Sequence, residues 1–223
     1  MKKGSVLQEQ MAYYAARAGE YDETTQRAGE ADPLMARLEA ELNAIRQRVA
    51  RLEPAARVLE LACGTGQWTG LLTAIGEQVT VIDGAAEMLM IHRQKLNNPQ
   101  VIYQQADLFE WSPSEEYELV FFAFWLSHVP PERLVPFLDQ VGKAVCAGGK
   151  LVIVDEPAGG LQVSGATEAM YQSRTLSDGR SFQIVKVYYD PHQIAAELNA
   201  RGFKTVVNGG GCVFQLEATK SGL

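Results

Sequence analysis

Residues 58–66, which read VLELACGTG, constrain the fold of this chain more than any other segment. A β-branched, apolar run ends there in the glycine turn Gly64-Thr65-Gly66, and a helical pattern follows in residues 67–75. A strand, a glycine turn and a helix in this order are typical of doubly wound α/β sheets, where ligands bind beyond the carboxyl ends of the strands. Glycine suits such a turn because it accepts positive φ and has no side chain to block a ligand.

The rest of the chain alternates between strand and helix patterns. Short apolar runs predict strands in residues 57–61, 79–82, 101–103, 118–125, 151–154, 203–207 and 213–218. Helical patterns lie between them in residues 67–75, 85–96, 132–145 and 191–201. This alternation predicts a parallel sheet with helices on both faces. The short connection Gly209-Gly210-Gly211 favours an antiparallel hairpin at the end of the sheet.

The chain has 223 residues, which fits one sizeable domain with a small cap. Residues 1–56 are expected to form an N-terminal helical segment, or lid, because apolar residues recur at spacings of three and four between Pro33 and Pro54. Residues 57–223 then form the main domain. Within it, residues 155–190 have no strong periodicity and are expected to cover the site. The run at 178–189 (DGRSFQIVKVYY) has a strand pair as its alternative.

The charge and the cysteines exclude several classes of function. A net charge of -7 and a pI near 5.1 argue against binding to nucleic acid or to an anionic membrane, which relies on basic patches. The longest apolar stretch, residues 119–126, is far too short to span a bilayer, and the N-terminus does not resemble a signal peptide. We therefore expect a cytoplasmic protein, its oligomeric state unknown, with reduced, buried thiols at Cys63, Cys146 and Cys212.

Acidic residues near the glycine turn indicate which ligand it binds. Glu60 lies inside the strand end, where it disfavours a pyrophosphate and suits a cationic ammonium group. A dinucleotide fingerprint needs glycine at position 69, but the residue there is Thr69. Asp83 ends the second strand and can accept hydrogen bonds from both ribose hydroxyls, and Asp107 follows the third strand, within reach of an adenine amino group. These residues indicate a ligand with an amino-acid tail and an adenosine.

In these motifs the chain resembles the class I S-adenosylmethionine (SAM)-dependent methyltransferase family. The matching segments are VLELACGTG (58–66), VTVID (79–83), QADLF (105–109), ELVFFAFWLSHV (118–129) and GGKLVIVDE (148–156). The resemblance covers residues 57–218 and implies a methyltransferase domain built on a Rossmann-like, doubly wound sheet of seven strands with an antiparallel last strand. It also implies SAM as the cofactor and S-adenosylhomocysteine (SAH) as the product. The segment YYAARAGEYDE resembles the start of many small-molecule methyltransferases.

The resemblance implies cofactor contacts at Glu60, Gly64, Asp83, Met88, Asp107, Leu108 and Phe124. We add their neighbours Ala62, Thr65, Gly66 and Gly84 to the expected set. If the N-terminal segment is a lid, Tyr14 or Arg17 lies near the methionyl carboxylate. Packing on the domain is the competing interpretation for that aromatic segment.

His128 follows the fourth strand and is the candidate general base, because a histidine titrates near neutral pH. Candidate acceptor contacts are Tyr13, Tyr21, Trp125, Arg174, Tyr188 and Tyr189. A structural role is the alternative for each of them. We expect no metal site, although the acids Asp155 and Glu156 after the fifth strand keep one in consideration.

The sequence thus predicts transfer of a methyl group from SAM to an oxygen or nitrogen of a small molecule, with an aromatic acceptor as one option. Methyl transfer requires mainly that the nucleophile is held close and aligned while water is excluded, so the lack of a catalytic triad does not count against it. Two alternatives stay open: an NAD(P)-dependent oxidoreductase on a similar sheet, and a SAM-binding protein that does not methylate. No nucleic-acid or membrane partner is expected.

Overall fold

A sheet of seven strands forms the centre of the protein, whose computed structural model describes residues 3–26, 33–160 and 170–222. The strands are β1 (Ala55–Leu61), β2 (Gly76–Asp83), β3 (Val101–Gln105), β4 (Tyr117–Ala123), β5 (Val145–Asp155), β8 (Phe203–Gly209) and β9 (Phe214–Lys220). Their order in the sheet is β3-β2-β1-β4-β5-β9-β8, and β9 is antiparallel to both of its neighbours. The expected doubly wound sheet with an antiparallel last strand is therefore confirmed.

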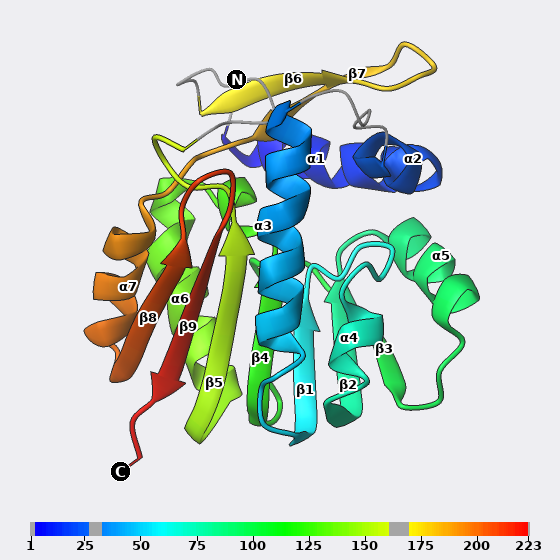
Figure 1. Ribbon diagram of the computed structural model, residues 1–223. Helices are drawn as coiled ribbons and strands as arrows, with labels where there is room; N and C mark the ends of the chain where they lie inside the picture. Colours follow the sequence, from blue (N-terminus) through cyan, green and yellow to red (C-terminus); the bar gives the residue numbers. More distant parts are fainter. Residues whose placement is uncertain (1–2, 27–32, 161–169, 223) are drawn as a thin grey trace.

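Helices α3 (Pro33–Val49), α4 (Thr69–Leu72) and α5 (Ala86–Leu96) cover one face of the sheet (Figure 1). The apolar positions of α3 recur every three or four residues, so they form one stripe that packs on the sheet. Ile45 and Val49 in this stripe are almost fully buried against strand residues such as Val58 and Phe121. The amphipathic pattern predicted between Pro33 and Pro54 thus places α3 on the sheet.

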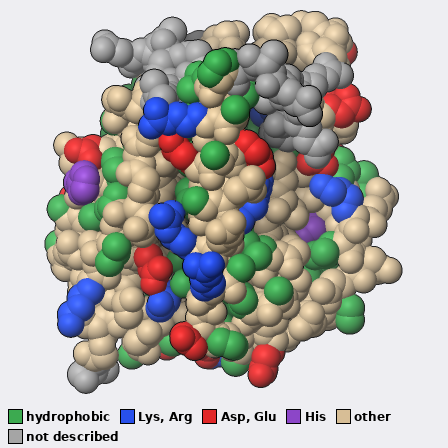
Figure 2. Space-filling view, in the orientation of Figure 1, with side chains coloured by type: hydrophobic (Ala, Val, Ile, Leu, Met, Phe, Trp, Pro, Cys, Tyr) green, Lys and Arg blue, Asp and Glu red, His purple; other side chains and the backbone are tan. Residues whose placement is uncertain are grey.

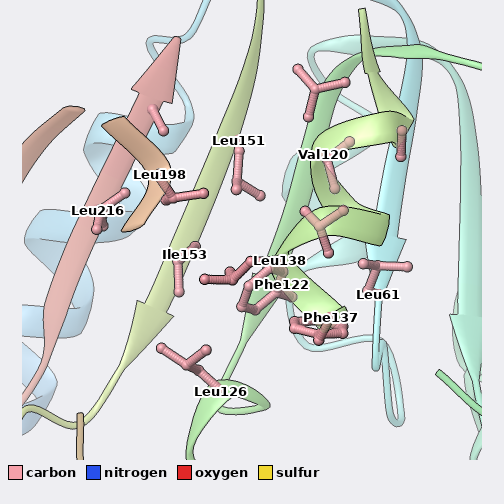
Figure 3. Packing of buried hydrophobic residues seen from close by; sticks show 14 of the residues in the cluster. Leu61, Val120, Phe122, Leu126, Phe137, Leu138, Leu151, Ile153, Leu198 and Leu216 are labelled. Carbon is pink, nitrogen blue, oxygen red and sulfur yellow. The ribbon is translucent and has the colours of Figure 1, made fainter. Parts of the chain in front are cut away.

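Helices α6 (Pro131–Ala144) and α7 (Pro191–Asn199) cover the opposite face. Figure 3 shows Phe137 and Leu138 of α6 packed against Phe122 of β4, and these side chains are at most 1% exposed. Strands β1, β4 and β5 are apolar on both faces because helices cover both sides of a parallel sheet. This two-sided core fixes the positions at which the strands end.

Two further units lie beyond the carboxyl ends of the parallel strands (Figure 1). One consists of α1 (Lys3–Arg17), the 3-10 turn η1 (Ala18–Glu20) and α2 (Tyr21–Gln26). The other is an antiparallel hairpin of β6 (Tyr171–Thr175) and β7 (Ser181–Val185). The alternative for residues 178–189 placed both strands of a pair within that run, but only β7 lies there, and its partner β6 precedes it. The parts of the expected lid and insertion at residues 27–32 and 161–169 lie outside the described residues.

Some expected boundaries need correction. The helix expected in residues 67–75 is reduced to the single turn α4, since its flanking residues form turns. The strand expected in residues 118–125 ends at Ala123, because Phe124 turns the chain with a φ of 55°. β5 begins at Val145 rather than at 151, and the pair Gly148-Gly149 lies inside it, where the register with β4 shifts.

Lys and Arg side chains alternate with Asp and Glu on the face that α3 covers, as Figure 2 shows. Ion pairs among the described residues include Arg37 with Glu41 and Arg57 with Glu115. Within residues 3–26, 33–160 and 170–222, no helix is both long enough and apolar enough to cross a membrane.

Candidate active site

A cavity of about 770 Å³, its open mouth included, lies at the carboxyl ends of β1, β2 and β4. Helix α1 forms its opposite wall through Leu7, Gln10, Met11 and Tyr14. A smaller hollow next to it reaches Glu60 and Thr65, and Tyr21 and Gly64 line both spaces. Sites for small molecules and cofactors are concave and lined mainly by apolar side chains with a few polar groups, and the lining of these two spaces has this character.

The glycine turn uses its two glycines in different ways. A Cβ atom on Gly64 would meet nothing within 4 Å, so this residue leaves its side of the cavity open. A Cβ atom on Gly66 would lie 2.5 Å from Cδ2 of His92, so this glycine allows the turn to pack on α5. Both have positive φ, 53° and 85°, and so does Ala62 at the end of β1, with 52°. Positive φ at a residue other than glycine is uncommon and is found at functional sites.

Asp83 holds the turn in place from the end of β2. Its Oδ2 accepts a hydrogen bond from the Gly64 amide and its Oδ1 accepts one from the Ala85 amide, each at 2.9 Å. Burial raises the pKa of Asp83, and these backbone hydrogen bonds oppose that effect. A carboxylate has about four acceptor positions, so Asp83 keeps acceptor capacity for a ligand after these backbone hydrogen bonds. Asp107 lines the same cavity, and its Oδ1 accepts from the Phe109 amide.

Glu60 lies at the base of the smaller hollow and is only 2% exposed. Burial is the main cause that raises its pKa to about 8, with a further contribution from the negative charge of Asp83. The hydroxyl of Thr69 donates a hydrogen bond of 2.5 Å to Oε2 of Glu60 and works in the opposite direction. A buried acid of this kind is ready to ionise when a cation arrives beside it.

Tyr14 and His128 meet at the wall of the cavity. The Nδ1 of His128 lies 2.7 Å from the carbonyl oxygen of Val185, which can only accept, so Nδ1 carries the proton. The Nε2 of the same ring then accepts from the Tyr14 hydroxyl at 2.7 Å. Burial, followed by the charge of Lys186, lowers the pKa of His128 to about 3. The imidazole is therefore neutral and held on both sides.

The N-terminal helices are tied to both halves of the site. Gln10 donates to the carbonyl of His128 and accepts from the amide of Val185. Asp22 accepts a hydrogen bond of 2.6 Å from the Thr65 hydroxyl and pairs with Lys95 of α5 at 2.7 Å. These contacts hold α1 and α2 over the glycine turn.

A buried ion pair lies behind His128. Lys186 is 6% exposed, and its Nζ lies 2.5 Å from Oε2 of Glu156 and 3.1 Å from Oγ of Ser127. Asp155 accepts hydrogen bonds from the amides of Ser127 and Glu156. Backbone amides thus bind the carboxylate of Asp155, and the ammonium group of Lys186 binds that of Glu156. In the part of the chain that the structure describes, no group of three or more His, Cys, Asp or Glu residues is placed to hold a metal.

Most of the residues expected at the site come together around these two spaces. Those that line them are Tyr14, Tyr21, Glu60, Ala62, Gly64, Thr65, Asp83, Gly84, Met88, Asp107, Leu108, Phe124, Trp125 and His128. Their roles toward a ligand stay predictions.

The other expected residues lie outside the walls of both spaces. Arg17 stacks on the rings of Tyr13 and Tyr21, with its guanidinium 5.6 and 4.7 Å from their centroids. Tyr13 itself packs on the β6–β7 hairpin. The Tyr189 hydroxyl donates to the carbonyl of Val129. The remaining three are Gly66, Arg174 and Tyr188.

Sequence reasoning missed several residues of the site. Gln10, Ser127 and Lys186 contact His128 or its neighbours, and Asp22 holds the glycine turn. Asp22 falls in the YYAARAGEYDE segment, so the motif gave a signal that was not used. Gln10 and Lys186 gave none, because each is an ordinary polar residue in the sequence until the fold brings α1 to His128 and the end of the hairpin to Ser127.

The comparisons with known proteins point to a single family. A family model described as a methyltransferase domain matches residues 58–149. Trans-aconitate 2-methyltransferase of Azoarcus sp. (strain BH72) is 32% identical over 187 residues, which are 77% of this chain and 71% of that protein. Demethylmenaquinone methyltransferase of Bacillus cereus (strain ATCC 10987 / NRS 248) is 29% identical over 117 residues, or 48% of each chain.

Solved structures resemble the whole chain. The complex of DhpI with SAH has a TM-score of 0.78 and 33% identity and covers 99% of both chains. The complex of DhpI with SAM and HEP has a TM-score of 0.78 and 34% identity, with 98% of this chain and 99% of that one covered.

Proposed function

This chain belongs to the class I SAM-dependent methyltransferases, and we propose that its acceptor is a carboxylate oxygen of a small organic acid. Membership of the family sets aside the NAD(P)-dependent oxidoreductase that the sheet alone would allow. The observation that carries the proposal about the acceptor is the neutral, doubly hydrogen-bonded ring of His128 among cationic side chains.

The residues around the two spaces fit SAM. Bound SAM supplies an electrophilic methyl group on a positively charged sulfur. We assign Glu60 to the ammonium group, because a buried carboxyl next to an arriving cation loses its proton and gains an ion pair. The remaining acceptor capacity of Asp83 suits the ribose hydroxyls, and the open side of Gly64 lets the backbone approach the ligand.

Positive charge gathers at the acceptor end of an otherwise acidic protein. The chain has a net charge of -7, yet Lys186, Arg174 and Arg17 all act to lower the pKa of His128, next to the larger effect of burial. Glu156 neutralises Lys186, but Arg174 and Arg17 add positive charge near the ring and create a local positive potential. Such a potential attracts an anionic acceptor and disfavours an amine.

His128 is poorly suited to take a proton from an alcohol. An effective general base has a pKa near the working pH, whereas burial and nearby cations hold the pKa of this ring at about 3. Its base role stays a prediction, and the contacts with Tyr14 and Val185 favour a role in orienting the Tyr14 hydroxyl. A carboxylate acceptor does not need a general base, because it is already ionised at neutral pH.

The name of one relative agrees with an acid acceptor. The Azoarcus protein is a methyltransferase of trans-aconitate, an organic-acid anion. In the reaction we propose, a carboxylate oxygen forms a bond to the methyl group, and the bonding pair of the broken carbon–sulfur bond stays with sulfur. No proton is transferred, so the residues of this chain need only hold the acceptor in line and exclude water.

Methyl transfer to an acid is tested with purified protein and SAM labelled on its methyl group. We expect label in a methyl ester when trans-aconitate is offered, released as methanol by alkali. The trimethyl ester of the same acid is the matched control, and it should take up no label because it has no free carboxylate. At saturating SAM, we also expect kcat/KM for trans-aconitate to stay level between about pH 6 and pH 8, where the carboxylate remains ionised.

Two results would overturn the proposal. The first is a product whose label survives alkali, as a methylated amine or phenol would. The second is a rate that falls with an apparent pKa near 6.5 as the pH is lowered, which is the behaviour of an ordinary histidine base.

A further inference from the structure

The inner face of the β6–β7 hairpin carries polar groups that the cofactor site does not use. Gln172 lies opposite Ile184 in the register of the two strands, and Arg174 lies opposite Phe182. Ile184 is buried against Tyr13 of α1, which identifies the inner face. Paired residues of two strands share a face, as do alternate residues of one strand, so Gln172 and Arg174 lie on that face too.

Gln172 is buried without a hydrogen-bond partner. It is 6% exposed, and neither Oε1 nor Nε2 has a partner among the residues that the structure describes. Nearly all buried polar groups are paired, so an orphaned amide calls for a cause such as a ligand. On the same face, Lys186 follows Ile184 by two residues, and its own ion pair with Glu156 is complete. The ion pair of Lys186 therefore does not satisfy the Gln172 amide.

Arg174 is half-buried on the same face. No carboxylate among the described residues pairs with its guanidinium, unlike those of Arg37, Arg57 or Arg201. Burial is the main influence on the pKa values of Tyr14 and His128, and the charge of Arg174 acts on both of these residues. Its unpaired charge therefore lies near the wall that separates the hairpin from the cofactor cavity.

We propose that Gln172 and Arg174 form a subsite for a second carboxylate group of the acceptor, remote from the oxygen that receives the methyl group. A guanidinium pairs with a carboxylate in bidentate geometry, and the amide nitrogen of a glutamine donates to the same group. Neither residue lines the cavity of Asp83 and Asp107, where the methyl donor belongs, so the group they hold is not the nucleophile. The inference rests on the proposed function and specifies the acceptor as a polycarboxylate.

Binding to the protein–SAH complex, measured by calorimetry, tests the subsite without methyl transfer. The probes are trans-aconitate, with three carboxylates, and crotonate, with one. We expect the wild-type complex to bind trans-aconitate at least tenfold more tightly than crotonate. Gln172→Leu and Arg174→Gln should each weaken trans-aconitate binding at least tenfold and leave the affinities for crotonate and SAH unchanged. The matched control is Ser173→Ala, because Ser173 lies on the exposed outer face of β6 and should change nothing.

The stability of Gln172→Leu separates this role from a structural one. Since the amide has no partner, its replacement by leucine should leave the unfolding temperature equal or higher while trans-aconitate binding falls. The proposal is overturned if both variants bind trans-aconitate as the wild type does, or if the wild type binds the two acids equally. A protein that binds trans-aconitate through Gln172 and Arg174 but methylates no acid would refute the proposed function and leave the subsite standing.

Discussion

Replacement of Glu60 by glutamine should make the cofactor-free protein more stable, and the gain should grow with pH. Burial is the main cause that raises the pKa of Glu60 to about 8, against 4.5 for an ordinary glutamate. Between these values the folded state holds a proton that the unfolded state has lost, so stability falls as the pH rises. The loss approaches 1.4 kcal/mol for each pH unit in this window, or about 3 kcal/mol between about pH 5 and pH 7.5.

Glu60→Gln cannot ionise, but its amide oxygen can still accept the hydrogen bond from Thr69. Urea unfolding at several pH values should therefore show the difference between variant and wild type widening by about 3 kcal/mol over that range. Glu87→Gln is the matched control, because Glu87 is exposed on the first turn of α5. This substitution should leave the dependence of the unfolding free energy on pH as it is in the wild type. Parallel profiles for Glu60→Gln and the wild type would refute the reasoning.

The same residue should couple cofactor binding to proton release. At about pH 7 the carboxyl of Glu60 is mostly protonated, since its pKa is about 8, and an ammonium group beside it favours the ionised form. SAH binding should then release close to one proton from the wild type. Glu60→Gln has no ionisable group at position 60, so this proton should not be released from the variant. Calorimetry in two buffers of different ionisation enthalpy measures the difference.

Three further outcomes are expected. Asp83→Asn should weaken SAH binding by about 1–3 kcal/mol, because its amide replaces one acceptor oxygen by a donor; an unchanged affinity by calorimetry would remove Asp83 from the cofactor site. Gly66→Ala should lower the unfolding free energy by about 1–3 kcal/mol, since the new Cβ would lie 2.5 Å from His92 at a φ of 85°, and adding His92→Ala should restore the steric part in urea unfolding. Tyr14→Phe should cost about 1 kcal/mol of stability, because Nε2 of His128 loses its donor, and should lower kcat; an unaltered kcat would show that the hydroxyl has no part in turnover.

The place of the glycine turn and of Asp83 could be predicted because the signals are local in the sequence. Gly64 comes three residues after the apolar strand β1, and Asp83 ends β2, so their places at one edge of a parallel sheet follow from the alternation of elements. The different functions of Gly64 and Gly66 could not be predicted, because His92 comes close to Gly66 only when α5 packs on the turn.

The acceptor half depends on contacts between distant segments, which no local pattern encodes. Lys186 and Glu156 are 30 positions apart and meet only because the hairpin folds back over the end of β5. Tyr189, a candidate acceptor contact, donates its hydroxyl to the carbonyl of Val129, which lies 60 positions earlier in the chain, and its contact with an acceptor stays a prediction. Gln172 gave no signal at all, because an amide shows its missing partner only once it is buried.

Helix α1 also protects the outer edge of β7. The amides of Gln183 and Val185 point away from β6, and the side chains of Glu9 and Gln10 accept their hydrogen bonds. An uncovered strand edge offers such groups to any other chain and promotes aggregation. The helix that closes the site therefore also keeps the protein from associating through this edge, and loss of α1 would lower colloidal stability together with activity.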